Sequence, residues 1–174
     1  RFPFPQVIFV RFCLFHPFIT VYFTDGKCCQ FVQGFVDMKY SQYGRTGAQV
    51  SRVGFGGMRF DISRSMEENA DLVLYAREKG INYLDTAPGY CEDQSEDIFG
   101  HAIGQMQADR DNFYVSTKGM PTEIQTADKA MEAVERSLQR LNVDKIDFYH
   151  VWCIRKMEQY EMAMKPGGQY EGLL

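Results

Sequence analysis

The sequence predicts an α/β fold built from parallel strands and crossover helices. Short β-rich runs are centred near Val53, Tyr83, Val115 and Phe148, so they recur at spacings of 30, 32 and 33 residues. Helical patterns fill the gaps between them. The runs are nearly continuous in apolar residues, with 146–149 the most mixed, as is typical of strands covered on both faces. A strand followed by a helix, repeated in this way, places the strands parallel.

Three helical segments separate these strands. The first begins at a capping box, Ser65 to Glu68, which satisfies the free amides of a helix N-terminus, and Gly80 supplies a stop signal. The second, 95–103, is shorter, and Gly100 is expected to weaken it because glycine is a poor helix former. The third, 126–141, again repeats apolar residues at helical spacing. The pattern predicts one helix after each of the first three strands.

Two architectures fit this pattern, an open doubly wound sheet and a (β/α)8 barrel of the TIM type. An open nucleotide-binding sheet usually has a G-x-G-x-x-G turn after its first strand, but residues 54–59 lack the third glycine. Polar residues instead recur at the ends of successive strands, where barrel enzymes keep their chemistry. We therefore expect the barrel. Because a closed barrel needs roughly 250 residues, only about the first four strand–helix units are present, and a new helix is expected to begin at Gln169.

The first 37 residues differ in composition from the rest of the chain. They hold nine of the 14 phenylalanines and only five charged residues. The run 7–23 is apolar, but Arg11 and His16 interrupt it, and a spanning helix needs about 20 mostly apolar residues. We expect 1–37 to be a leader outside the fold, ahead of a coding start at Met38. A membrane anchor and an extra hairpin are the alternatives.

Composition excludes several classes of function. A formal charge of −4 with mixed signs gives no basic surface for nucleic acid. The five cysteines are odd in number and show no C-x-x-C spacing, which argues against a disulfide framework and against a zinc site, so no metal is expected. A reducing, cytoplasmic setting is the simplest interpretation.

A carboxylate, a phenol and a lysine lie where predicted strands end. Asp85 closes the strand that begins at Ile81, Tyr90 follows it by five residues, and Lys118 closes the strand that begins at Phe113. Reduction of a carbonyl by hydride leaves negative charge on oxygen, so an acid must protonate that oxygen. A phenol is a weak acid at neutral pH, but a nearby ammonium stabilises its phenolate form, and a carboxylate keeps the ammonium charged. The three residue types suit these roles.

Each of these residues also has an ordinary explanation when it is taken alone. Asp85 can cap a turn, Tyr90 can be a loop aromatic, and Lys118 can be a solvated strand end. Their occurrence on consecutive units of one repeat is what favours the catalytic interpretation. His150, on the fourth strand, is a further candidate that either hydrogen-bonds a substrate carbonyl or lies in the barrel interior as a core histidine.

With these residues in view, 38–174 resembles the N-terminal half of an aldo-keto reductase. The matching segments are 38–51, similar to the hairpin that plugs the barrel floor; 53–58, similar to the first strand and its cofactor-facing loop; Asp85-Thr86-Ala87 with Tyr90, Ser95-Glu96 and Gly100; Ser116-Thr117-Lys118; and Ser137-Leu138, Arg140-Leu141 and 144–149.

The resemblance implies that Asp85, Tyr90 and Lys118 are catalytic. The family histidine falls at Trp152 in this chain, two residues after His150. Two residues along a strand face the same side, so His150 is expected about 6–7 Å deeper, and either His150 or Trp152 takes the histidine's place.

The resemblance also implies NADPH or NADH as cofactor, bound without a Rossmann fold and mostly by later strands. Gly57, Met58 and Asp85 are the positions expected near the nicotinamide. The stretch from Tyr149 to Gly168 is similar to a bacterial and archaeal branch whose longer members often carry a C-terminal iron–sulfur module. This chain has no cluster-binding motif, so an iron–sulfur cluster is expected only in a full-length parent.

Three functions remain open at this point. The first is a nicotinamide-dependent reductase of a small aldehyde or ketone, present here as a truncated chain whose activity is open. The second is a Schiff-base lyase that uses Lys118 as the nucleophile. The third is a non-catalytic half-barrel fragment.

Overall fold

The structure of the protein, a computed structural model, describes residues 21–22, 28–29 and 38–174. The chain divides into two units at the boundary between Asp37 and Met38. In the first unit, β1 (Val21–Tyr22) pairs antiparallel with β2 (Cys28–Cys29). Nearly all of the apolar run 7–23 lies outside the described residues, and the expectation that 1–37 form a leader stays a prediction. Among the described residues, no helix has both the length and the apolar content to cross a membrane.

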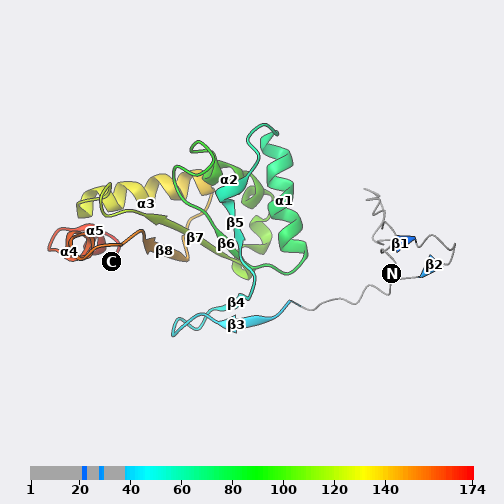
Figure 1. The fold of residues 1–174 in the computed structure, drawn as a ribbon, viewed down its shortest axis with the longest axis horizontal. Coiled ribbons are helices and arrows are strands. Elements are labelled where there is room, and N and C mark those ends of the chain that lie inside the picture. Colours follow the sequence, from blue (N-terminus) through cyan, green and yellow to red (C-terminus); the bar gives the residue numbers. More distant parts are fainter. Residues whose placement is uncertain (1–20, 23–27, 30–37) are drawn as a thin grey trace, which may run out of the picture. The chain divides into compact units, whose positions relative to one another are not determined.

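The second unit is built on a sheet of four parallel strands (Figure 1). These are β5 (Phe55–Gly56), β6 (Tyr83–Asp85), β7 (Tyr114–Gly119) and β8 (Phe148–Val151). Their order in space is their order in the sequence, and each neighbouring pair is parallel. A doubly wound sheet reverses its strand order at a switch point, whereas a barrel adds each strand beside the last. The order β5-β6-β7-β8 is therefore that of a barrel wall.

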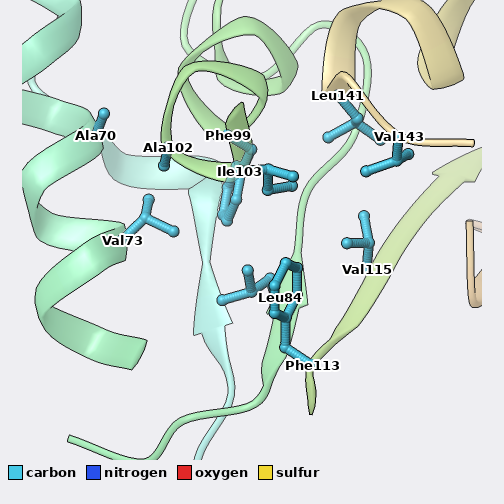
Figure 2. Packing of buried hydrophobic residues seen from close by; sticks show 10 residues of the cluster. All are labelled: Ala70, Val73, Leu84, Phe99, Ala102, Ile103, Phe113, Val115, Leu141 and Val143. Atoms are coloured by element: carbon cyan, nitrogen blue, oxygen red, sulfur yellow. The ribbon is translucent and has the colours of Figure 1, made fainter. Parts of the chain in front are cut away.

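Three helices cover one face of this sheet. They are α1 (Met66–Glu78), α2 (Ser95–Gln105) and α3 (Ala127–Leu141), and they lie side by side in the order of the strands they follow (Figure 1). Between the helices and the sheet lies the hydrophobic core (Figure 2). It consists of Ala70, Val73, Leu84, Phe99, Ala102, Ile103, Phe113, Val115, Leu141 and Val143.

The helix starts follow from capping chemistry. The Ser65 hydroxyl accepts a hydrogen bond from the Glu68 amide at 3.1 Å, and the Ser65 amide donates to the Glu68 carboxylate at 3.0 Å, which confirms the predicted capping box. Thr126 caps α3 by accepting from the Lys129 amide at 3.3 Å. The helix then ends at Asn142, in the left-handed conformation with φ of 54°.

The second helix is two residues longer than predicted, and Gly100 within it has a packing role. It runs to Gln105, and a Cβ at Gly100 would overlap the backbone carbonyl of Arg140 on α3. The missing side chain therefore lets α2 and α3 approach closely, and this contact offsets the low helix propensity of glycine.

Two other elements differ from the predictions. The first strand lies at β5, two residues after the expected centre at Val53, which is 55% exposed and outside the strand. A helix, α4 (Met157–Met164), was not predicted. Its start depends on Gln159, whose side-chain oxygen accepts from the amides of Arg155 and Lys156 at 2.7 and 3.1 Å. The short helix α5 (Gln169–Gly172) begins where expected.

A hairpin closes the N-terminal end of the sheet. Strands β3 (Tyr40–Gln42) and β4 (Gln49–Ser51) pair antiparallel, as the resemblance to a floor-plugging hairpin predicts. Asn82, just before β6, accepts from the Ser51 amide at 2.6 Å and donates to the Gln49 carbonyl at 2.8 Å. The ring of Tyr43, in the hairpin turn, lies 4.7 Å from the ring of Phe148 on β8. These contacts hold the hairpin at the N-terminal end of the sheet, on the side that the helices do not cover.

Two further short helices complete the described elements. The 3-10 helix η1 (Gly57–Arg59) follows β5, and η2 (Gln107–Asn112) links α2 to β7. Both lie in connections between strands and helices, and η1 carries two of the residues expected near a cofactor.

Candidate active site

The candidate site lies on the sheet face opposite the helices, near the carboxyl ends of β6 and β7. Asp85 is the last residue of β6 and stands beside Ser116 of β7 in the parallel register. Its carboxylate accepts from the Ser116 hydroxyl at 2.9 Å and from the Lys118 ammonium at 2.6 Å. Because each carboxylate oxygen has its own donor, the orientation of the carboxylate is fixed.

Lys118 is buried, and an ion pair compensates its charge. It is 7% exposed, whereas the side chain of Asp85 is 32% exposed. An ammonium that loses its hydration needs a counter-charge and hydrogen bonds, and Asp85 supplies both. Asp85 therefore holds the Lys118 ammonium at a fixed position in the site.

Tyr90 joins this pair from the loop 86–94, which links β6 to α2. The Lys118 ammonium lies 5.1 Å from the centre of the Tyr90 ring, within the range of a cation–π contact. The edge of the ring also meets Trp152, with 6.3 Å between the ring centres and an angle of 89°. The structure thus brings Asp85, Lys118 and Tyr90 together, although the contact to Tyr90 is through its ring.

His150 lies on the same face but makes a different contact. It stands beside Lys118 in the register of β7 and β8, and its Nε2 is 3.2 Å from the Tyr83 hydroxyl. Tyr83 precedes Asp85 by two residues, so His150 is bonded towards the hairpin end of the sheet. Burial lowers the pKa of His150, which is therefore neutral at pH 7, and burial raises the pKa of Tyr83 to about 12.

Trp152 and His150 occupy the two positions that the sequence left open for the family histidine. Trp152 directly follows β8, is 38% exposed and contacts Tyr90, whereas His150 contacts Tyr83 one layer deeper. Which of the two contacts a substrate stays a prediction.

The residues expected near a cofactor lie at the next strand. Gly57 is buried, and a Cβ there would overlap Ser95 and Phe99 of α2, so its missing side chain is explained by packing. Met58 is 51% exposed. Gly56 stands beside Asp85 in the register, and a Cβ on Gly56 would meet nothing within 4 Å. The backbone of Gly56, with open space around it and Asp85 beside it, leaves room for a planar ring.

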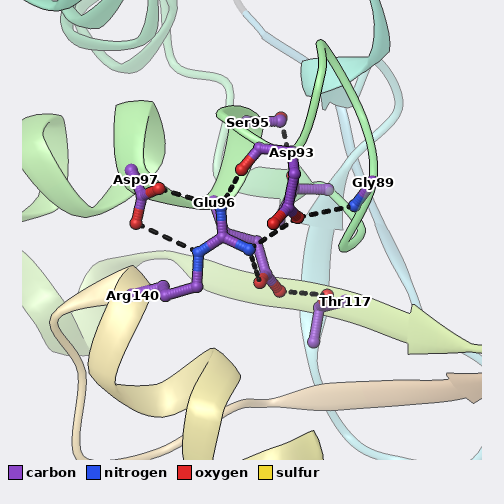
Figure 3. Close-up of polar contacts among 8 residues, drawn as sticks. Gly89, Asp93, Ser95, Glu96, Asp97, Thr117 and Arg140 are labelled. Atoms are coloured by element: carbon purple, nitrogen blue, oxygen red, sulfur yellow. Dashed lines mark hydrogen bonds and ion pairs between the residues drawn. The ribbon is translucent and has the colours of Figure 1, made fainter.

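Sequence reasoning missed a network of charged residues behind this site (Figure 3). It joins Asp93 on the Tyr90 loop to Glu96 and Asp97 at the start of α2, to Arg140 at the end of α3 and to Thr117 of β7. The sequence identifies Glu96 and Arg140 only through the resemblance to the family. Their contact depends on the close approach of α2 and α3 at Gly100, which no local pattern reveals.

Comparisons with known proteins agree with this fold. Residues 52–166 match the model of the aldo/keto reductase family. L-galactose dehydrogenase of Arabidopsis thaliana is 34% identical over 113 residues, which are 62% of this chain and 35% of that protein.

Two solved structures are also similar. An aldo-keto reductase of Bacillus halodurans in its holo form superposes with a TM-score of 0.58 at 29% identity, over 72% of this chain and 45% of that one. An aldo-keto reductase of Bombyx mori in complex with NADP gives a TM-score of 0.56 at 29% identity, over 67% and 38%. The chain spans less than half the length of each of these relatives.

Proposed function

The chain belongs to the aldo/keto reductase family, and from this premise we propose that its site reduces an aldehyde or ketone to an alcohol with a nicotinamide cofactor. One observation carries the proposal. A buried ammonium, held by a carboxylate at 2.6 Å, lies against the ring of a tyrosine at the carboxyl ends of two neighbouring strands. In barrel enzymes that end of the strands is where reacting groups gather.

Each of the three residues has a separate role in the proposed reaction. Tyr90 gives its phenolic proton to the carbonyl oxygen as negative charge develops there. The Lys118 ammonium stabilises the phenolate that remains, and Asp85 holds the ammonium in place. The proton thus goes to oxygen, and the two electrons that complete the alcohol come as hydride from the reduced nicotinamide when it is bound.

The surroundings of Asp85 fit such a cofactor. Gly56 presents bare backbone next to Asp85, and the exposed Met58 lies on η1 just beyond it. We propose that these positions, with Gly57 shaping the turn, contact the nicotinamide ring. His150 is proposed as a neutral hydrogen-bonding neighbour of the substrate carbonyl, oriented from below by Tyr83.

The ion pair argues against the Schiff-base alternative. A lysine that attacks a carbonyl needs the lone pair of its nitrogen free, whereas the Lys118 nitrogen donates to the Asp85 carboxylate at 2.6 Å. No observation in the described part of the chain favours the lyase. The following experiment distinguishes a reductase from a non-catalytic half-barrel.

The test is oxidation of NADPH by a simple aromatic aldehyde, measured for the wild-type chain and for Tyr90→Phe. We expect Tyr90→Phe to lower kcat by about 10²–10⁴-fold, which is the usual contribution of a general acid. An NADPH fluorescence titration is expected to give the same Kd for both proteins, since the phenol acts on the substrate.

Tyr75→Phe is the matched control. Tyr75 is 58% exposed on α1, away from the site, and this variant should keep wild-type turnover. Turnover in Tyr90→Phe equal to that of the wild type would exclude Tyr90 as the acid. Saturable NADPH binding without turnover by the wild-type chain would instead support the non-catalytic half-barrel.

A further inference from the structure

The loop that carries Tyr90 has an unusual backbone. Three consecutive residues, Cys91, Glu92 and Asp93, have positive φ angles of 54°, 53° and 65°. Residues other than glycine seldom enter this left-handed region, and when they do it is usually one residue at a time. A turn of this kind persists only where surrounding contacts hold it. Those contacts determine where Tyr90, the residue just before the turn, is placed.

Most of these contacts converge on Asp93. Its carboxylate accepts from the Gly89 amide at 2.9 Å and from the Arg140 guanidinium at 2.7 Å. Arg140 also donates to the backbone carbonyl of Asp93 (Figure 3). The loop is thereby fastened on both sides of Tyr90, because Gly89 precedes it and Asp93 follows it.

Arg140 joins this loop to the first turn of α2. Its Nε and Nη2 atoms donate to the two carboxylate oxygens of Asp97 at 3.1 and 2.8 Å, which is the bidentate geometry that a planar guanidinium allows. The side chain of Arg140 is only 15% exposed. One guanidinium therefore holds the loop and the helix start at the same time.

The same guanidinium faces a buried carboxylate that reaches the lysine strand. Glu96 is fully buried and accepts from the Thr117 hydroxyl at 2.8 Å, and Thr117 immediately precedes Lys118. The other oxygen of Glu96 lies 3.6 Å from Arg140 and has no hydrogen bond within the part of the chain that the structure describes. Arg140 is thus placed between the loop of Tyr90 and the strand of Lys118.

We propose that Arg140 and Asp93 are positioning residues that set the place of Tyr90 against Lys118. The inference rests on the proposed function for its kinetic consequence, but the position of Tyr90 is measurable without turnover. Trp152 is the only tryptophan of the chain, and its ring lies edge to face with Tyr90. Its emission therefore reports whether Tyr90 is in place.

The test compares Asp93→Ala and Arg140→Lys with the wild-type chain. Asp93 is 64% exposed in its side chain, so its removal does not open the core. Arg140→Lys keeps a positive charge near Glu96 but loses the planar fork. We expect both variants to shift Trp152 emission to longer wavelength and to increase its quenching by iodide. Tyr90→Ala sets the full size of this change.

Kinetics give the second measurement. Misplacing a catalytic group by about 1 Å can cost on the order of 10²-fold in rate. We expect kcat of both variants to fall on the order of tenfold to hundredfold, with little change in KM for the aldehyde.

Asp109→Ala is the matched control. Asp109 forms an ion pair with Arg77 between η2 and α1, with 43% of its side chain exposed, and it lies outside the site and the network. This variant should match the wild type in Trp152 emission and in kcat, whatever its melting temperature.

The outcomes separate the two proposals. Wild-type emission and wild-type kcat in a folded Asp93→Ala protein would overturn the positioning role and leave the ion pairs as structural contacts. A wild-type chain without turnover would count against the proposed function alone. In that case the Trp152 emission of Asp93→Ala and Arg140→Lys still decides whether Asp93 and Arg140 position Tyr90.

Discussion

The two faces of the strands β6 and β7 differ more than any other two regions of this molecule. Leu84 and Val115 point to the helices and are almost completely buried among apolar side chains. Their neighbours in sequence, Asp85 and Ser116, point to the other face and form a hydrogen bond there. Because side chains alternate along a strand, one step along the chain separates the core from the chemistry.

This difference shows how stability and reactivity are divided. The helix face binds the unit together through close packing, so changes there are expected to act on the free energy of unfolding. The open face holds charged and aromatic groups, so changes there are expected to act on turnover. Three sets of variants test this division between stability and turnover.

The largest expected effect is on the helix face. Phe99 on α2 is 1% exposed and is part of the hydrophobic core between the helices and the sheet. Phe99→Ala leaves a cavity and should lower the free energy of unfolding by about 3–5 kcal/mol, measured by urea denaturation. Leu72→Ala, at a 43% exposed position of α1, should change it by about 0.5 kcal/mol or less. Equal losses in the two variants would contradict the assignment of the core.

The next effect is on the open face. Lys118→Met removes the ammonium but keeps an unbranched side chain, so we expect kcat for aldehyde reduction to fall on the order of 10²–10³-fold. Its effect on unfolding should be smaller than that of Phe99→Ala, since Asp85 keeps its bond to Ser116 and is partly exposed.

Lys79→Met is the control for this variant. Lys79 also lies over a tyrosine ring, that of Tyr75, with 4.7 Å from its ammonium to the ring centre, but it is exposed at the end of α1. It should keep wild-type turnover. A Lys118→Met protein that is as active as Lys79→Met would remove Lys118 from the reaction.

The smallest expected effect is on the pH dependence of the free energy of unfolding, and it comes from His150 on the open face. Burial lowers the pKa of His150 below its usual 6.5. The unfolded chain therefore takes up a proton near pH 6.5, and the folded chain does so only at lower pH. Between these values the unfolded state binds more protons, so the free energy of unfolding should fall as the pH drops from 7 to 5.

His150→Gln removes this contribution. The variant should lose less stability than the wild type between pH 7 and pH 5, measured by urea denaturation at fixed ionic strength. Parallel pH profiles for the two proteins would show that His150 is not buried in its neutral form.

Local sequence patterns predict much of the fold, because several of its elements depend on residues that are close together in the chain. The cap at Ser65 depends on residues three positions apart, and the strand spacing follows from where the apolar runs fall in the sequence. The helix α4 was missed because its start relies on Gln159 reaching back to two amides, a contact without an apolar repeat. The first strand was misplaced because only two of its residues pair with β6.

Part of the candidate site could also be predicted from the sequence. Asp85 and Lys118 stand at strand ends, and the predicted parallel register brings strand ends together. The partner of His150 and the network around Arg140 were not readable, because they depend on tertiary packing. The bond from His150 to Tyr83 needs β6 and β8 on either side of β7, and Arg140 needs the close contact at Gly100.

The sequential strand order also has a consequence for how the unit forms during synthesis. Each strand pairs with the one made about thirty residues earlier, so its partner is already present when it leaves the ribosome. At a synthesis rate of about 5–20 residues per second, successive units emerge roughly two to six seconds apart. That interval is long compared with the folding of a local strand and helix. The sheet can therefore grow one strand at a time, and the contact of Tyr43 with Phe148 forms only when β8 arrives.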